Sequence, residues 1–199
     1  MTYLKSGSSS SKQKHQYQRR HRKADASIWT GNDWTVQWLD DTKFKVEYEG
    51  LDLYNEDVLN WIEAVDYQIK SYFGGRPPDL TMSMLNFSCN NITDEGIIGL
   101  VDYLCSNRIS VDKIMLHKNL IRDEGAAAIG RLLANSPRPV QEVHLSHNYI
   151  CNKGICAIMD GVRKADCYPY DTERWLGNKS GTRQAWSPLW LRVENNTFD

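Results

Sequence analysis

A segment of twelve residues occurs three times in this chain at a constant interval, with copies that begin at Leu85, Ile114 and Val143. A shorter fourth copy begins at Leu191. Each copy has apolar residues at its first and third positions and asparagine at its sixth, and the three full copies end in glycine. A unit of about 29 residues cannot bury its own apolar face, so the repeat predicts that neighbouring units stack into a solenoid. A stacked chain presents an extended surface, which favours a binding protein over an enzyme.

Each repeat has two halves whose apolar residues follow different spacings. The first half fits a short strand with its apolar side inward, and the second half fits an amphipathic helix. The alternation predicts an α/β solenoid with parallel strands inside and helices outside. The strand positions are Met82, Leu85 and Phe87, then Val111, Ile114 and Leu116, then Val140, Val143 and Leu145, and finally Pro188, Leu191 and Val193. The helical positions are Ile97, Leu100, Val101 and Leu104, then Ala126, Ile129, Leu132 and Leu133, then Ile155, Ile158, Met159 and Val162.

The pattern Leu-x-Leu-x-x-Asn-x-Ile-x-Asp-Glu-Gly, followed by a helix, resembles the long leucine-rich repeats of the ribonuclease-inhibitor type over about residues 80–199. The resemblance implies a curved horseshoe. It also implies a structural role for the repeated asparagine, whose amide binds backbone groups where the strand turns away. These asparagines are Asn90, Asn119, Asn148 and Asn196. The Asp-Glu pair before the glycine lies where carboxylates can cap a helix and favour its dipole.

Residues 27–79 precede the repeats and have the pattern of an N-terminal cap. Apolar residues alternate in residues 34–39 and 43–48, on either side of Asp40 and Asp41, which predicts a β-hairpin. A helix follows, with Asn55 or Asp57 as its N-cap and one apolar stripe. We expect the hairpin and the helix to cover the end of the stack. The stripe comprises Val58, Trp61, Ile62, Val65, Ile69 and Tyr72.

The interval between the third and fourth copies, from Val143 to Leu191, is longer than the interval between the earlier copies. The extra residues fall within about 164–187 and include Tyr168, Tyr170, Trp175 and Trp186. This aromatic insertion predicts either a lid packed on the edge of the solenoid or a protrusion that binds a partner. The chain stops at residue 199, inside the fourth copy. We therefore expect a fragment of a longer protein, and a strand that caps the stack is the alternative.

In a leucine-rich solenoid, the residues between the inward apolar positions face the concave surface. Because neighbouring strands lie about 4.8 Å apart, equivalent positions of successive repeats become neighbours. His117 is then expected beside Ser146, and His144 beside both Met115 and Arg192. The resulting patch is mixed, basic and aromatic, and suits contact with a protein or an acidic ligand; a solvated face without a partner is the alternative. The candidate partner-binding residues are Lys113, Met115, His117, His144, His147, Trp190 and Arg192.

Two sets of residues resemble a zinc site and a nucleophilic site, but their positions in the repeat argue against both. Zinc needs four ligands converging at about 2.0–2.3 Å, but the candidate ligands fall on different positions of the turn and the helix. Ser146 and His117 could form half of a nucleophilic pair, but no carboxylate is placed to orient the histidine. The sequence thus predicts no metal, no cofactor, no catalytic site and no small-molecule substrate. The candidate zinc ligands are His144, His147, Cys151 and Cys156.

Residues 1–26 form a polar, basic tail, which predicts disorder. Residues 1–23 contain seven Lys and Arg side chains and no acid, in a chain whose overall formal charge is −1. Such a tail can bind RNA phosphate without sequence preference. A nuclear-import address and a leader without a binding role are the alternatives. The candidate nucleic-acid-binding residues are Lys12, Lys14, Arg19, Arg20, Arg22 and Lys23.

The five cysteines are an odd number and follow no paired framework, and the chain shows neither a hydrophobic targeting core nor an apolar run of about 18 residues. We therefore expect an intracellular protein, cytoplasmic or nuclear, that does not enter membranes. The first functional hypothesis is a non-enzymatic scaffold that binds a protein through the concave face and the aromatic insertion. The alternatives are an RNA- or ribonucleoprotein-associated protein and a regulatory domain of a larger protein.

Overall fold

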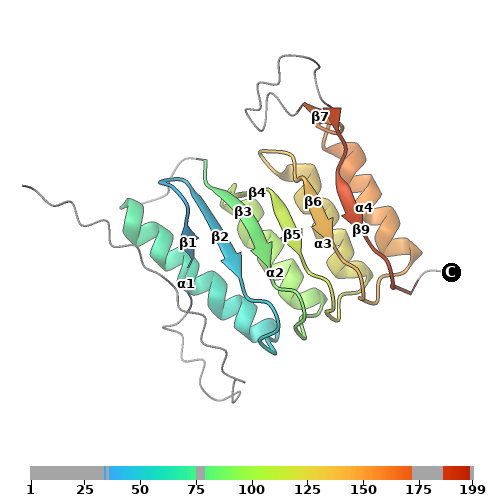
Figure 1. Ribbon diagram of the computed structural model, residues 1–199, viewed down its shortest axis with the longest axis horizontal. Helices are drawn as coiled ribbons and strands as arrows, with labels where there is room; N and C mark the ends of the chain where they lie inside the picture. The colour runs from blue at the N-terminus through green and yellow to red at the C-terminus, as the bar shows by residue number, and fades with distance from the viewer. Residues whose placement is uncertain (1–33, 35, 75–78, 172–185, 198–199) are drawn as a thin grey trace, which may run out of the picture.

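The computed structural model describes residues 34, 36–74, 79–171 and 186–197. Within them one sheet runs in the order β1, β2, β3, β5, β6 and β9, and β4 also pairs with β3 (Figure 1). In this sheet β1 alone is antiparallel to its neighbour, which confirms the expected α/β class with parallel strands. The strands are β1 (Gln37–Trp38), β2 (Lys43–Glu47), β3 (Thr81–Asn86), β4 (Ser110–Val111), β5 (Lys113–Met115), β6 (Glu142–His144) and β9 (Trp190–Arg192).

Four helices lie along one side of the sheet in the described part of the chain (Figure 1). They are α1 (Asn55–Phe73), α2 (Asp94–Ser106), α3 (Asp123–Asn135) and α4 (Asn152–Lys164). The apolar positions of the repeats meet between the two layers, where Leu85, Ile114 and Val143 are fully buried. Each such side chain stabilises the fold by about 1.5–3 kcal/mol. None of the described helices has both the length and the apolar character that crossing a bilayer requires.

The N-terminal hairpin joins the same sheet as the repeats. It is shorter than the sequence predicts, because only Gln37 and Trp38 pair with the second strand. That strand, β2, runs parallel to β3 with Val46 opposite Leu85, and α1 packs beside α2. The segment is therefore a further strand-and-helix unit. Val46 and Leu85 lie farther apart in the sequence than Leu85 and Ile114, and for this reason the repeat pattern does not reveal it.

The start of α1 differs from the sequence prediction. The N-cap is Tyr54, and not Asn55 or Asp57. Asp57 still contributes to capping from within the first turn, because its carboxylate accepts a hydrogen bond from the backbone N–H of Tyr54 at 2.8 Å. Asn55 instead contacts the start of the next helix, where its amide oxygen accepts from the backbone N–H of Thr93 at 3.0 Å. The prediction was wrong because tertiary contacts, which local pattern does not contain, fixed the helix start.

The apolar stripe of α1 also ends earlier than predicted. Val58, Trp61, Val65 and Ile69 are buried, whereas Ile62 is half-buried. Tyr72 is 63% exposed, so its assignment to the stripe was wrong. Its ring stacks on Trp38, with centroids 5.4 Å apart and planes at 22°. The helix runs past the edge of the core at this point, and the ring covers the hairpin instead.

The repeated asparagines form a ladder of side-chain hydrogen bonds between units. Asn119 is representative: its amide oxygen accepts from Ile92 N at 3.1 Å, and its amide nitrogen donates to the carbonyls of Phe87 and Leu116 at 2.9 and 3.1 Å. These backbone groups are buried where the strand turns away, so they would otherwise lack partners. Equivalent bonds from a unit to the preceding one are made by Asn90, Asn148 and Asn196.

A second ladder joins the helix starts, and it corrects the expected role of the Asp-Glu pair. Asp94 and Asp123 do not cap their own helices, whose N-cap residues are Thr93 and Arg122. Each aspartate instead accepts from the N-cap backbone of the following helix: Asp94 from Arg122 N, at 2.6 Å, and Asp123 from Cys151 N, at 2.8 Å. The close approach of a side-chain oxygen explains the glycine at the end of each full copy: the carboxylate of the preceding unit at Gly125 and Gly154, and the amide of Asn55 at Gly96. A Cβ at Gly125 would lie 2.6 Å from Oδ1 of Asp94.

The insertion after α4 is described only at its two ends. Tyr170–Asp171 (β7) pairs antiparallel with Trp186–Ser187 (β8), and Tyr168 donates a hydrogen bond to the carbonyl of Val140 at 2.9 Å. The base of the insertion thus packs against the segment that leads into β6. Trp175 lies outside the described residues, so the choice between a lid and a protrusion stays open.

Candidate binding surface on the sheet

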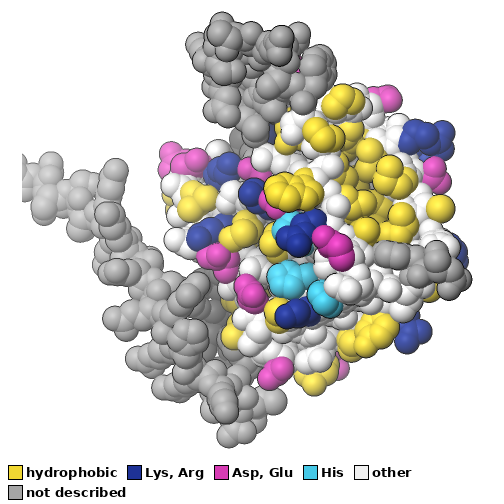
Figure 2. Space-filling model, turned by 45° about the vertical axis from the view of Figure 1, so that its right-hand side comes forward, with side chains coloured by type: hydrophobic (Ala, Val, Ile, Leu, Met, Phe, Trp, Pro, Cys, Tyr) yellow, Lys and Arg dark blue, Asp and Glu magenta, His cyan; other side chains and the backbone are white. Residues whose placement is uncertain are grey.

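The sheet face, defined here as the face opposite the helices, carries side chains from successive repeats in aligned rows. The strand register sets Lys113 beside Glu142 and then Trp190, and it sets Met115 beside His144 and then Arg192. A third row follows the strand ends and comprises Glu49, Ser88, His117, Ser146 and Glu194. Figure 2 shows histidines gathered with Lys, Arg, Asp and Glu side chains on this face.

Glu142 joins two basic side chains of the sheet face. Its carboxylate lies 2.9 Å from Nζ of Lys113 and 2.7 Å from Nε2 of His144. Burial opposes ionisation of Glu142, but the hydrogen bonds and charges of its two partners prevail and lower the pKa of the carboxyl. The carboxylate is therefore ionised at neutral pH and fixes both basic side chains.

Trp190 and Arg192 lie on β9 at the edge of the sheet. Trp190 is 62% exposed, and its ring contacts His144 edge-on with centroids 6.3 Å apart. Arg192 Nε lies 3.4 Å from the carboxylate of Glu194, which also accepts a hydrogen bond from the hydroxyl of Ser146. The Ser146 bond is the leading reason that the pKa of Glu194 falls to about 2. The edge strand thus holds a large exposed ring next to a paired guanidinium.

The residues of the candidate serine–histidine pair and of the candidate zinc site contact other residues and not one another. Ser146 donates to Glu194, while Nε2 of His117 lies 3.8 Å from Sγ of Cys89, so serine and histidine do not pair with each other. Of the four candidate zinc ligands, His144 contacts Glu142, and His147 contacts the amide of Asn195 at 3.2 Å. Cys151 contacts Thr197 and Cys156 is an exposed residue of α4. Neither set converges.

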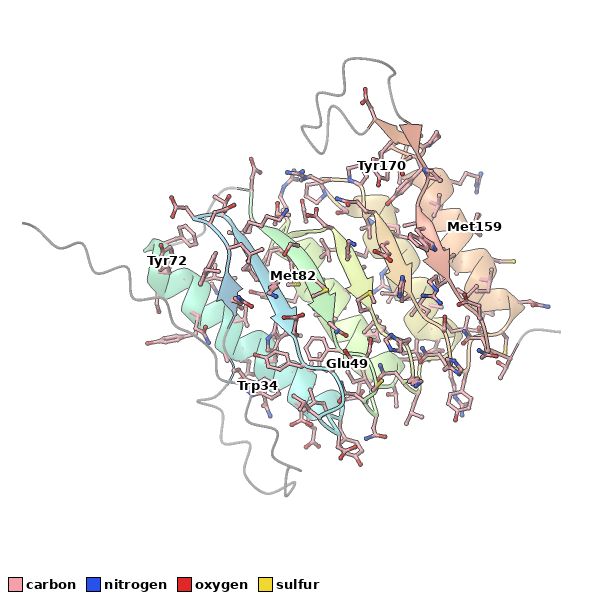
Figure 3. All side chains as sticks on the ribbon, viewed as in Figure 1. Trp34, Glu49, Tyr72, Met82, Met159 and Tyr170 are labelled. Atoms are coloured by element: carbon pink, nitrogen blue, oxygen red, sulfur yellow. The ribbon has the colours of Figure 1, made fainter. Side chains whose placement is uncertain are left out.

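Sequence reasoning missed Glu49, which the fold brings to the sheet face from the end of β2 (Figure 3). Its carboxylate accepts a hydrogen bond from the amide of Asn86 at 3.2 Å and lies 4.0 Å from Sγ of Cys89. Glu49 precedes the recognisable repeats, so its position in the third row could be found only by aligning β2 with β3. The longer spacing between these two strands concealed that alignment.

A hollow of about 700 Å³ lies away from the sheet face, along the loops that lead into α2 and α3. Its walls include Asp94, Leu120, Arg122 and Tyr149. Asp94 and Arg122 already bond to each other there through the helix-start ladder. The hollow therefore lies where neighbouring repeats pack together, and its polar walls already bond to each other.

The basic tail lies outside the described residues. The candidate nucleic-acid-binding residues therefore lie outside them as well: Lys12, Lys14, Arg19, Arg20, Arg22 and Lys23. Their binding to RNA stays a prediction from composition.

Comparison with known proteins agrees with the repeat geometry. A sequence model of the leucine-rich repeat family matches residues 81–101, which span β3 and the first part of α2. The match identifies a leucine-rich repeat at this point, the class of unit that the strand, asparagine turn and helix define. No curated protein matches the chain.

Proposed function

We propose that this protein is a non-enzymatic scaffold that binds a partner protein through the sheet face. Leucine-rich repeats generally mediate contacts between proteins, and the matched repeat and the parallel sheet support that class of function. We further propose that the units form a short solenoid of the ribonuclease-inhibitor type, with the sheet face as its concave surface. The partner-binding residues proposed are Lys113, Met115, His117, His144, His147, Trp190 and Arg192.

The observation that carries this proposal is the exposure of Trp190 beside paired basic side chains. A tryptophan that is 62% exposed leaves a large apolar surface in water. Tryptophan and arginine are the residues that most often dominate the energy of protein interfaces. Trp190 and Arg192 are neighbours on one strand, and His144 supports the ring from the next strand. An anchor of this kind suits a partner with an apolar pocket rimmed by acidic groups.

Preorganisation of the neighbouring polar groups supports the same proposal. Lys113 and His144 are held by Glu142, and Arg192 is held by Glu194. Side chains that are already ordered lose less conformational entropy on binding, so the surface gains affinity without extra area. A partner would then add contacts to existing pairs and would not need to break them.

The test compares partners captured by the wild-type chain and by a Trp190→Ala/Arg192→Ala variant, with quantitative mass spectrometry as the readout. The matched control is Tyr67→Ala/Arg163→Ala, which removes an exposed aromatic ring and an arginine from the helix layer. We expect partners to be lost from the first variant and retained by the control. The same partner list for all three proteins would overturn the assignment of the sheet face.

A second proposal concerns the tail and follows from its charge of +7 over residues 1–23. We propose that this tail binds RNA phosphate while the repeats contact a ribonucleoprotein. Its affinity for RNA should fall steeply with salt, because each neutralised phosphate releases counterions. Removal of residues 1–24 should abolish the binding. Equal and weak binding by both chains would refute this second proposal and leave the first unaffected.

A further inference from the structure

Three side chains of different metal-binding types meet at the strand ends of the sheet face. Glu49 follows β2, Cys89 follows β3, and His117 follows β5, so they come from three adjacent strands. One carboxylate oxygen, the thiol sulfur and one imidazole nitrogen all lie within 4.8 Å of one another. The sulfur is 3.8 Å from Nε2 of His117 and 4.0 Å from Oε1 of Glu49. These residues form the Glu49 cluster.

The distances from the Cys89 sulfur to its two neighbours are close to those of a tetrahedral metal site. Zinc binds sulfur at about 2.3 Å and imidazole nitrogen or carboxylate oxygen at about 2.0–2.2 Å. With tetrahedral angles, two such ligand atoms lie about 3.5 Å apart. The two separations from the sulfur exceed this value by a few tenths of an ångström. The carboxylate oxygen and the imidazole nitrogen lie within 4.8 Å of each other, so side-chain rotations must bring these two closer for all three atoms to coordinate one ion.

The turn of the repeat fixes the backbone at Cys89. Cys89 has a left-handed conformation, with φ of 58°, as do Lys118 (55°), His147 (57°) and Asn195 (56°) at the equivalent points of the later units. The repeat architecture imposes this turn, so Cys89 is held next to its neighbours by the fold itself. In the later units the same point carries lysine, histidine or asparagine. The thiol, imidazole and carboxylate therefore meet at the turns that follow β2, β3 and β5.

We propose that Glu49, Cys89 and His117 bind a zinc ion, with the fourth position open to water or to a side chain of a partner. A thiolate and an imidazole favour zinc and softer transition metals, and they disfavour Ca²⁺ and Mg²⁺, which take oxygen ligands. The two negative charges of carboxylate and thiolate balance the charge of the ion. This inference does not depend on the partner-binding proposal above, since the three residues alone define the site.

The surroundings of the cluster support this assignment. Asn86 donates to Glu49 Oε2 at 3.2 Å while its own amide oxygen accepts from Ser88 N at 3.1 Å, so the carboxylate is oriented by a fixed neighbour. Partners of this kind set the geometry of metal ligands. The hydroxyl of Ser88, which lies in the row between Glu49 and His117, is buried and has no partner among the described residues. A water bound to the metal is one group that could satisfy it.

Burial raises the pKa of the Cys89 thiol, and the charge of Glu49 raises it further, against the opposing effect of Lys118, so the free thiol holds its proton at neutral pH. Binding of zinc would displace this proton to solvent and leave the thiolate as the ligand.

Metal titration of the full 199-residue chain tests the proposal. We expect one Zn²⁺ per chain, and with Co²⁺ in its place a thiolate-to-cobalt charge-transfer absorption. Removal of an outer partner of a metal site costs about 10–100-fold in affinity, so removal of a ligand should cost about 100-fold or more. The ligand variants are Cys89→Ser, His117→Ala and Glu49→Gln. The controls are Cys156→Ser and Glu124→Gln, which remove an exposed thiol and an exposed carboxylate from the helix layer.

A second measurement needs no variant and so is independent of folding defects. Zn²⁺ should protect Cys89 of the wild-type chain from alkylation while Cys151 and Cys156 continue to react, as read by peptide mass spectrometry. Equal labelling of Cys89 with and without Zn²⁺ would overturn the proposal. Zinc affinity that Cys89→Ser and His117→Ala leave unchanged, or that Glu124→Gln lowers as much as they do, would do the same.

Discussion

The carboxylate of Glu142 lies 2.7 Å from Nε2 of His144, two residues along the same strand, and both side chains are largely buried on the sheet face. A strand places residues i and i+2 on one face, so this pair follows directly from the backbone. Lys113 of the preceding unit reaches the same carboxylate at 2.9 Å. The arrangement joins two repeats through one acid.

The lowered pKa of Glu142 predicts a dependence of stability on pH. Because the folded pKa lies below the unfolded value, the unfolded chain binds more protons in acid. The stabilisation is therefore complete above the unfolded pKa of about 4.5 and is lost as the pH falls through the folded pKa. Glu142→Gln should lower stability near neutral pH and flatten this acid dependence. Urea midpoints measured over about pH 3–7 check it, and parallel curves for the two proteins would contradict it.

The asparagine ladder predicts a large cost for Asn119→Ala. The change leaves Ile92 N and the carbonyls of Phe87 and Leu116 buried without this partner. Each buried group that loses its bond costs about 1–3 kcal/mol, so we expect a loss of about 3 kcal/mol or more. The control is Asn91→Ala, a half-buried neighbour of the preceding unit outside the ladder. Denaturant unfolding measures both, and similar losses would show that the ladder contributes little.

The helix-start ladder predicts different effects for two adjacent acids of α3. Asp123 accepts from Cys151 N and Gly154 N at 2.8 and 2.9 Å, whereas Glu124 is exposed in the same first turn. Asp123→Ala and Glu124→Ala remove the same charge from the dipole of α3, so the dipole effect is matched. Asp123→Ala should cost about 1–2 kcal/mol more, the usual value of a helix cap. Thermal melting of the two variants gives the difference, and equal melting temperatures would assign Asp123 to its own helix alone.

The close packing of α3 on α4 predicts that Gly161 accepts no side chain. A Cβ at this position would meet the backbone of Gly130, with its Cα only 2.6 Å away. Backbone atoms cannot rotate aside, so Gly161→Ala should destabilise by about 1–3 kcal/mol or more. At Gly99 a Cβ would meet only the movable end of Leu59, at 2.8 Å, and Gly99→Ala should cost less. Chemical unfolding of both variants provides the check, and a neutral Gly161→Ala would show that the helices can separate without penalty.

The repeat itself was predictable from sequence. The constant interval between copies identified the strands, the turns with Asn119 and its equivalents, and the three later helices, because one apolar pattern repeats whenever one structural unit repeats. The neighbours Met115 and His144 also followed from it, since a parallel sheet aligns equivalent residues.

Tertiary structure decided the contacts between units, which the repeat interval does not encode. Asp94 and Asp123 bond to the following helix, and Asn55 does the same, because stacking brings one helix start against the next. Glu49 reaches Cys89 because β2 pairs in parallel with β3. The sequence interval between these two strands is longer than the repeat, so the repeat does not predict the contact. Local pattern determines which unit a residue belongs to, whereas packing between units determines which residues of neighbouring units meet.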